Sequence, residues 1–253
     1  MDLGLRDRVF LVTAASSGLG RATAQQLVTE GARVVLVARR ADVLDEVVAG
    51  LGAAQAVSLT ADLSDPATAE QACRLALDTW GRLDGALVSV GGPAAGSALG
   101  TSEDDWRAGF DSVFLAALRV TRAVVAAGTA PDLTLAWVLS TSVKAPIGGL
   151  AVSNGLRPGL AMLVKQLADE LGPDGTRVVG LMPGRVETDR VKHLDSLSAD
   201  PVAQRATSEA GIPLRRYGQP EEFGRVATFL LSPAASYVTG SVVAVDGGAT
   251  RAL

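Results

Sequence analysis

The sequence predicts one α/β domain, built as a doubly wound, parallel seven-stranded sheet with helices on both faces. Short valine-rich apolar runs alternate along the chain with longer segments of helical periodicity. Strands that are apolar on both faces are typical of a parallel sheet covered by helices on both sides. The 253 residues are 48% hydrophobic, which is enough to bury a large core in one domain spanning residues 1–253. We find no internal repeat, linker or low-complexity segment.

The predicted elements follow one another in a regular order. Six segments of helical periodicity lie at about 18–30, 41–51, 65–80, 103–127, 157–171 and 220–231. Ser102 precedes the fourth of these helices as a candidate N-cap. A polar insert, residues 184–219, separates the last two strands. The predicted strands are Val9–Thr13, Arg33–Ala38, Gln55–Thr60, Ala86–Val90, Thr134–Ser140, Arg177–Met182 and Val242–Val245.

Composition excludes several classes of protein. The net charge of −4 shows no basic bias, so we expect neither nucleic acid nor an anionic membrane as a partner. Arg119 and Arg122 interrupt the longest apolar stretch, and the N-terminus has no signal-peptide pattern, so we expect a cytoplasmic protein. The single cysteine, Cys73, is predicted to be a core residue. One histidine and one cysteine do not make the usual metal clusters, so no metal is predicted.

A glycine-rich turn follows the first predicted strand. In "TAASSGLG", Gly18 and Gly20 open a helix directly behind that strand. The free N–H groups and the dipole of a helix N-terminus favour a phosphate, and glycine lets a pyrophosphate approach the backbone. The pattern predicts a dinucleotide site, with an unliganded tight turn as the alternative.

The second predicted strand ends in Arg39 and Arg40. Sites for NAD usually place an acidic residue there to bind the ribose 2′-hydroxyl, whereas arginine suits a 2′-phosphate. NADP(H) is therefore favoured over NAD(H).

Five motifs together resemble the short-chain dehydrogenase/reductase family, and within it the 3-oxoacyl-[acyl-carrier-protein] reductase-like branch. They are "TAASSGLG", "ADLSD", "LVSVGG", "LMPGRVETD" and "SYVTGSVVAVDGG", and they span essentially the whole chain. The resemblance implies a Rossmann-type domain, a nicotinamide cofactor and a homotetramer or homodimer. It also implies that residues 185–217 form a substrate loop.

The resemblance also assigns a cofactor site. Asp62 would bind the adenine amino group, Gly91 would pass near the cofactor, and Pro183 with Gly184 would lie beside the nicotinamide. The predicted cofactor-binding residues are Thr13, Ala15, Ser16, Ser17, Gly18, Leu19, Gly20, Arg39, Arg40, Asp62, Leu63, Gly91, Pro183 and Gly184. One departure lies in the turn itself, where Ala14 replaces the family's glycine. A Cβ there restricts the backbone dihedrals and crowds the turn.

The catalytic positions depart further from the family. Its tetrad of Asn, Ser, Tyr and Lys becomes Val113, a serine, Ser153 and Arg157. Flanking residues favour Ser142 as the family serine, whereas spacing favours Ser140. Arginine stays protonated and cannot relay a proton as lysine does, although it can still bind a ribose.

Pro158 bears on the geometry of these positions. Inside a helix it would clash with the carbonyl of Asn154, so we expect the helix to begin near Pro158. In that case Ser153 and Arg157 need not share a helix face.

Three hypotheses remain. The chain is an oxidoreductase with a different proton donor, a catalytically silent NADP(H)-binding protein, or a structural subunit that binds no nucleotide. We favour the first because Ser140, Ser142, Lys144, Ser153 and Arg157 fall in one neighbourhood. Lys144 is the best substitute donor, since burial beside Arg157 would depress its pKa, and Tyr217 and His193 come next.

The substrate is not identified by residues 185–217. We expect a small molecule or an acyl carrier. A carrier protein would favour a basic patch, which Arg185, Arg190, Arg215 and Arg216 could supply, and scattered solvated arginines are the alternative.

Overall fold

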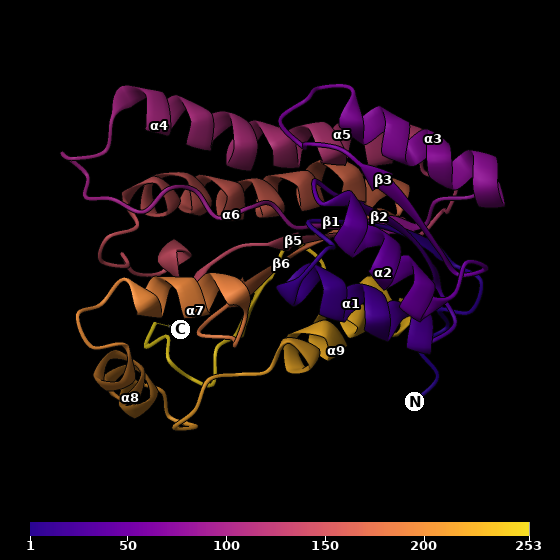
Figure 1. The fold of residues 1–253 in the computed structure, drawn as a ribbon. Coiled ribbons are helices and arrows are strands. Elements are labelled where there is room, and N and C mark those ends of the chain that lie inside the picture. Colours follow the sequence, from indigo (N-terminus) through magenta and orange to yellow (C-terminus); the bar gives the residue numbers. More distant parts are fainter. Residues whose placement is uncertain (253) are drawn as a thin grey trace.

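The strands of the computed structural model, which describes residues 1–252, form one sheet. Its order is β3-β2-β1-β4-β5-β6-β7, and every neighbouring pair is parallel (Figure 1). The predicted fold class is confirmed. The strands are β1 (Val9–Thr13), β2 (Arg33–Ala38), β3 (Ala56–Thr60), β4 (Gly85–Val88), β5 (Thr134–Val138), β6 (Arg177–Pro183) and β7 (Val242–Val245).

Helices cover both faces of the sheet (Figure 1). A π-helical segment, Phe110–Leu115, joins α4 to α5, so the predicted helix at 103–127 is nearly continuous. Ser102 caps it as predicted, because its hydroxyl accepts from the Asp105 amide. The helices are α1 (Gly18–Thr29), α2 (Ala41–Leu51), α3 (Thr68–Trp80), α4 (Glu103–Gly109), α5 (Ala116–Ala127), α6 (Ala151–Leu171), α7 (Asp189–Ser196), α8 (Pro201–Gly211) and α9 (Pro220–Leu231).

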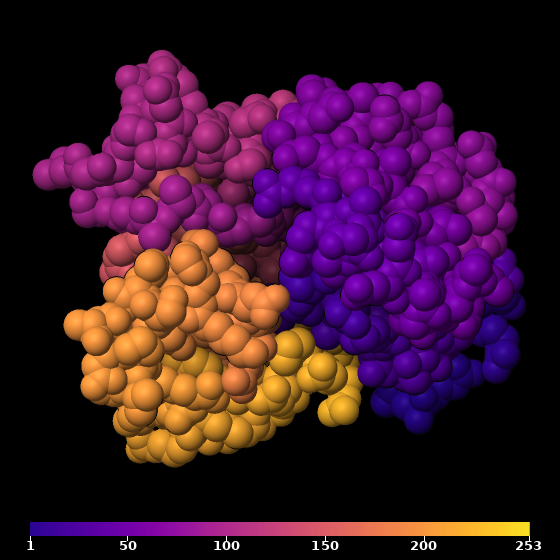
Figure 2. All heavy atoms as spheres, in the orientation of Figure 1, coloured from indigo at the N-terminus to yellow at the C-terminus, as the bar shows by residue number. Residues whose placement is uncertain are grey.

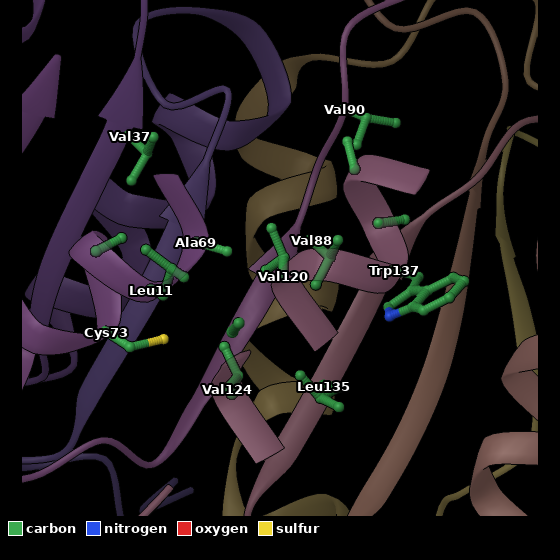
Figure 3. Close-up of a cluster of buried hydrophobic side chains, with 14 of the residues drawn as sticks. Leu11, Val37, Ala69, Cys73, Val88, Val90, Val120, Val124, Leu135 and Trp137 are labelled. Carbon is green, nitrogen blue, oxygen red and sulfur yellow. The ribbon is translucent and has the colours of Figure 1, made fainter. Parts of the chain in front are cut away.

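Two hydrophobic cores result, one on each face of the sheet. The first lies under α3, α5 and α6 and includes Cys73, Val124, Leu135 and Trp137 (Figure 3). Cys73 is buried, which confirms the prediction of a core residue, and burial raises the pKa of its thiol to about 12. The second core lies under α1, α2 and α9 and includes Phe223. Together the cores hold the sheet rigid and fix the positions of its strand ends.

The carboxyl ends of the strands meet along one edge. Because β1 pairs with both β2 and β4, the chain direction across the sheet reverses beside β1. Ligands of open parallel sheets bind at such a switch point, outside the carboxyl ends. Figure 2 shows a hollow there, between the N-terminal half of the chain and the segment that carries α7.

The expected start of the helix near Pro158 is wrong. Helix α6 begins at Ala151 and carries Pro158 inside it. The helical turn before the proline is stabilised by a loop outside the helix. The side-chain amide of Asn154 accepts from the Ile147 amide and donates to the Ile147 carbonyl. Buried Ser153 and Arg157 fix the same turn, so tertiary contacts offset the hydrogen bond that the proline removes. As a result, Ser153 and Arg157 share one helix face.

The polar insert is more ordered than its weak periodicity indicates. Residues 184–219 form α7 and α8, whose N-caps are the side chains of Thr188 and Asp200. Across residues 1–252, no helix combines the length and apolarity that a bilayer crossing requires.

Candidate functional site

The glycine-rich turn leaves the N-terminus of α1 open. Ser17 occupies the N-cap position, but its side chain makes no capping hydrogen bond and the first turn carries no acidic residue. The first amides of the helix therefore remain available to an anion. Gly18 has a φ of +56°, and a Cβ at Gly20 would lie 2.6 Å from the Ala14 carbonyl oxygen. These two glycines are required by the turn itself.

Ala14 has a φ of +50°, in the left-handed region that favours glycine. Replacing it with glycine should raise the free energy of unfolding by about 0.5–1 kcal/mol, because relief of this strain outweighs the added freedom of the unfolded chain. Urea denaturation of the wild type and Ala14→Gly measures the difference. Gly81→Ala is the reverse test, because φ is +70° there and the added Cβ would meet nothing within 4 Å. This variant should lower the free energy of unfolding by a similar amount, since it introduces the same backbone strain. An Ala14→Gly variant less stable than the wild type would contradict this account.

Thr13 connects the turn to the neighbouring strand. Its buried hydroxyl donates to the Ser89 carbonyl over 2.6 Å and accepts from the Ser89 amide over 2.8 Å. Thr13 was predicted to bind the cofactor, and in the structure its hydroxyl holds β1 against the end of β4. Ala15 is buried as well, and its amide donates to the carbonyl of Val37.

The two arginines at the end of β2 take different roles. Arg40 donates to the Ser16 hydroxyl over 3.1 Å, which brings a cation against the glycine-rich turn. Arg39 is largely exposed and lies 3.8 Å from a carboxylate oxygen of Asp62. Hydrogen bonds from the amide and hydroxyl of Ser64, with Arg39 a weaker cause, lower the pKa of Asp62. Two cations, a hydroxyl and open amides thus gather at one corner of the site.

The predicted catalytic serines lie together. The Ser142 and Ser153 hydroxyls are both buried and 3.2 Å apart. Ser140 caps the short helical turn 141–143, since its hydroxyl accepts from the Ser142 amide. Ser142 therefore faces Ser153, which stands where the family has its tyrosine, and Ser140 holds Ser142 in place.

Arg157 lies one helical turn after Ser153 and is only 6% exposed. Its Nη1 donates to the carbonyls of Val138 and Leu139 at the end of β5, over 2.8 and 3.3 Å. Burial, followed by repulsion from Arg190, lowers the pKa of this guanidinium to about 10, so it stays charged at neutral pH. No carboxylate within residues 1–252 forms an ion pair with it. It is a buried cation at the centre of the site.

Lys144, Tyr217 and His193 were considered as proton donors in place of the family's tyrosine. None of the three lies in the buried, uncommitted environment that this role requires. Lys144 is exposed, so it lacks the burial beside Arg157 that this role requires. His193 lies on the exposed surface of α7. Tyr217 is buried, but its hydroxyl donates to Asp195 and its ring packs under the Arg205 guanidinium. Burial, and to a lesser degree this hydrogen bond to Asp195, raises the pKa of Tyr217, which makes it a weaker acid at neutral pH.

Val113 lies in the π-helical segment and is fully buried, so it contributes packing and no polar group. A second feature of this region, a pair of glycines on α6, had no signal in the sequence. A Cβ at Gly155 would lie 2.8 Å from the Trp106 ring, and one at Gly159 would lie 3.2 Å from Phe114. These glycines allow α6 to approach α4 and the π-helical segment closely, which explains their spacing of four.

The remaining predicted cofactor residues lie near the same edge of the sheet. Gly184 packs closely against Asp246, because a Cβ added at Gly184 would lie 2.6 Å from the Asp246 Cβ. Pro183 ends β6 and pairs with Val245, whereas Gly91 is exposed beyond the end of β4. Leu63 packs against the first hydrophobic core, so its side chain turns away from the cleft and only its main chain remains for a ligand.

Two of the four arginines considered as a basic patch form ion pairs. Arg185 pairs with Asp195 at 2.5 Å, and Arg216 pairs with Glu222 at 2.7 Å. Arg215 donates to the carbonyl of Ala210. Arg190 differs, because it turns inward and donates to the Pro93 carbonyl over 2.8 Å. The ion pairs of Arg185 and Arg216 reduce the positive charge that this loop would offer to an acidic carrier protein.

The site fits a dinucleotide by the chemistry of its donors. The open N-terminus of α1 and the close contact at Gly20 suit a pyrophosphate, and Ser16 with Arg40 suits a further phosphate. Within residues 1–252, no group of three or more His, Cys, Asp or Glu side chains could hold a metal ion.

Comparison with known proteins agrees with this geometry. A family model described as enoyl-(acyl carrier protein) reductase matches residues 13–250. The chain is 32% identical to a 3-oxoacyl-[acyl-carrier-protein] reductase of Synechocystis, over 96% of this chain and 97% of the relative. The chain belongs to the short-chain dehydrogenase/reductase family.

Two solved structures are similar to it throughout. L-sorbose reductase from Gluconobacter frateurii, complexed with NADPH and L-sorbose, has a TM-score of 0.92 at 27% identity, with all of both chains covered. An NADPH-bound short-chain oxidoreductase from Pseudomonas aeruginosa that contains an atypical catalytic center has a TM-score of 0.89 at 27% identity. That alignment covers 98% of this chain and 100% of the other.

Proposed function

We propose that this protein is an NADP(H)-dependent oxidoreductase that interconverts a carbonyl and an alcohol without the usual tyrosine. The observation that carries the proposal is the buried hydroxyl pair Ser142–Ser153, one helical turn from the buried cation Arg157. A protein that only kept the fold would not need a buried guanidinium that forms no ion pair within residues 1–252 beside two hydroxyls, because burying a charge is costly.

The cofactor corner supports NADP(H) over NAD(H). Arg40 and Ser16 would hold the 2′-phosphate, with Arg39 reaching it from the surface, and the first amides of α1 would hold the pyrophosphate. Asp62 would accept from the adenine amino group. When bound, the nicotinamide supplies or accepts the hydride.

The chain's own residues would manage the oxygen and the proton. Either hydroxyl of the Ser142–Ser153 pair can donate to a carbonyl oxygen, which polarises the carbonyl. The Arg157 charge would stabilise the negative charge that develops on that oxygen. Because serine does not ionise at neutral pH, the pair would pass a proton inward from water at the mouth of the hollow instead of acting as a strong acid.

Calorimetric titration with NADPH and NADH tests the cofactor. We expect micromolar NADPH binding that weakens about 10–100-fold in Arg40→Met, since one charge-assisted contact to phosphate is lost, with NADH binding unchanged. Arg74→Met, an exposed arginine on α3, is the matched control and should bind NADPH normally. Equal losses for both nucleotides would show that Arg40 supports the turn and does not read the 2′-phosphate.

A second function is favoured by one observation. No group in the cluster has both an ionisable proton near neutral pH and a buried place beside Ser153, because Lys144 is exposed and Tyr217 is held by Asp195. This favours a catalytically silent NADP(H)-binding protein. NADPH oxidation, followed across a panel of ketones and oxo acids, separates the two functions, since only the enzyme turns over.

A further inference from the structure

Two arginines are buried in this protein, and they differ in how their donors are used. Arg177 donates to the carbonyls of Leu230, Ser232 and Val238 and to the Thr134 hydroxyl, at 2.9–3.0 Å. It ties β6 to the end of α9, so its role is structural. Arg157 uses Nη1 alone, which leaves its Nε and Nη2 without a hydrogen bond among residues 1–252. Its unused donors suit a ligand.

Arg190 approaches the same place from α7. Its Nη2 donates to the Pro93 carbonyl just beyond β4, and its guanidinium lies against Gly92, where a Cβ would be 2.9 Å from Nε. Pro93 in turn neighbours the first turn of α6, because Gly109 contacts both Pro93 and Val152. The residue after Val152 is Ser153. Arg190 therefore approaches the start of α6 from α7, and it lies close enough to Arg157 for their charges to repel.

The two guanidinium groups repel one another, and no carboxylate of residues 1–252 neutralises either. The repulsion contributes to the lowered pKa of Arg157. Neither arginine forms an ion pair with any residue from 1 to 252, although Arg185, Arg205 and Arg216 in or beside the same loop all do. Two like charges beside buried hydroxyls are stabilised best by an anion between them.

We propose that Arg157 and Arg190 bind the carboxylate of the substrate, so that this site acts on a small oxo acid or hydroxy acid. The proposal rests on the proposed function of the site and names its substrate class. The planar forks of two arginines match the two oxygens of a carboxylate. The carboxylate would hold the carbonyl against Ser142 and Ser153. An acyl group on a phosphopantetheine arm fits less well, since its phosphate lies at the far end of a long arm, away from the reacting carbon.

The test compares acids with their neutral esters. Pyruvate, acetoacetate and 4-oxopentanoate, each alongside its methyl ester, are titrated by calorimetry into the NADPH-saturated protein and into the cofactor-free protein. At least one acid should bind about 10–100-fold more tightly than its ester, as expected for a charge-assisted pair. Arg190→Met should remove that preference and leave ester binding unchanged, whereas Arg190→Lys should keep part of it. Arg122→Met, an exposed arginine on α5, should bind all ligands normally.

The outcomes separate the substrate class from the function. Acids and esters that bind equally to a protein that binds NADPH would overturn the carboxylate proposal and leave the proposed function standing. A protein that binds no NADPH contradicts the proposed function, and the cofactor-free titration then decides the carboxylate site independently. If Arg190→Met weakens NADPH as much as the acid, the arginine pair serves the cofactor phosphates and the proposal is wrong.

Discussion

Replacing Gly20 with alanine should destabilise the protein by about 2–3 kcal/mol and remove measurable NADPH binding. The added Cβ would lie 2.6 Å from the Ala14 carbonyl oxygen and 3.0 Å from that of Thr13, and backbone atoms move little to relieve such a clash. Any shift also moves the amides at the start of α1 that would face the pyrophosphate. Urea denaturation measures the first effect and calorimetric titration with NADPH measures the second.

Gly50→Ala provides the matched control. Gly50 lies in the last turn of α2, where an added Cβ would meet no atom within 4 Å. Alanine should therefore stabilise the protein by about 0.5–1 kcal/mol and leave NADPH binding unchanged. If Gly20→Ala behaved like Gly50→Ala, the turn would not require glycine and the proposed phosphate site would lose its main support.

The Arg177→Met variant should lose about 3–5 kcal/mol of stability. Methionine leaves the carbonyls of Leu230, Ser232 and Val238 and the Thr134 hydroxyl without their donor, and all of these bonds except the one to Val238 are buried. The contact between β6 and the end of α9 should loosen as a consequence. Thermal and urea denaturation both measure this loss.

The same substitution at Arg157 should change the free energy of unfolding by no more than about 1 kcal/mol. Two carbonyl hydrogen bonds are lost, but a buried charge is removed as well. Burial lowers the folded-state pKa below that of the unfolded chain, so the charge costs stability at every pH below about 10, and the cost shrinks as pH rises further. Arg157→Met should still lose the binding of acids. A loss of stability as large as that of Arg177→Met would make Arg157 a structural residue and contradict its place in the site.

The parts of the fold and site that could be predicted from the sequence are those that depend on residues close together in the chain. The strands and the glycine-rich turn were recognisable because each depends on neighbouring residues: alternation with helices, a run of valines, or a glycine where a Cβ cannot fit. For the same reason the motifs indicated the family, and Arg40 lies beside the turn as the end of β2 predicts. Ala14 was recognised as a departure, and its φ of +50° confirms that its Cβ is under strain.

Contacts between residues far apart in the sequence decided where α6 begins and which polar side chains are buried. Pro158 indicated a helix start by its own chemistry, but the Asn154–Ile147 pair and the burial of Ser153 and Arg157 extend α6 back to Ala151. The hypothesis that Lys144 donates the proton required its burial beside Arg157, yet Lys144 is exposed.

The inward turn of Arg190 had no local signal either, because Pro93, which holds it, is 97 residues away. Local sequence patterns were therefore sufficient to predict the fold, the glycine-rich turn and the family. They could not predict which polar groups meet beneath the cleft, since such a meeting depends on how distant helices pack against the same strand ends.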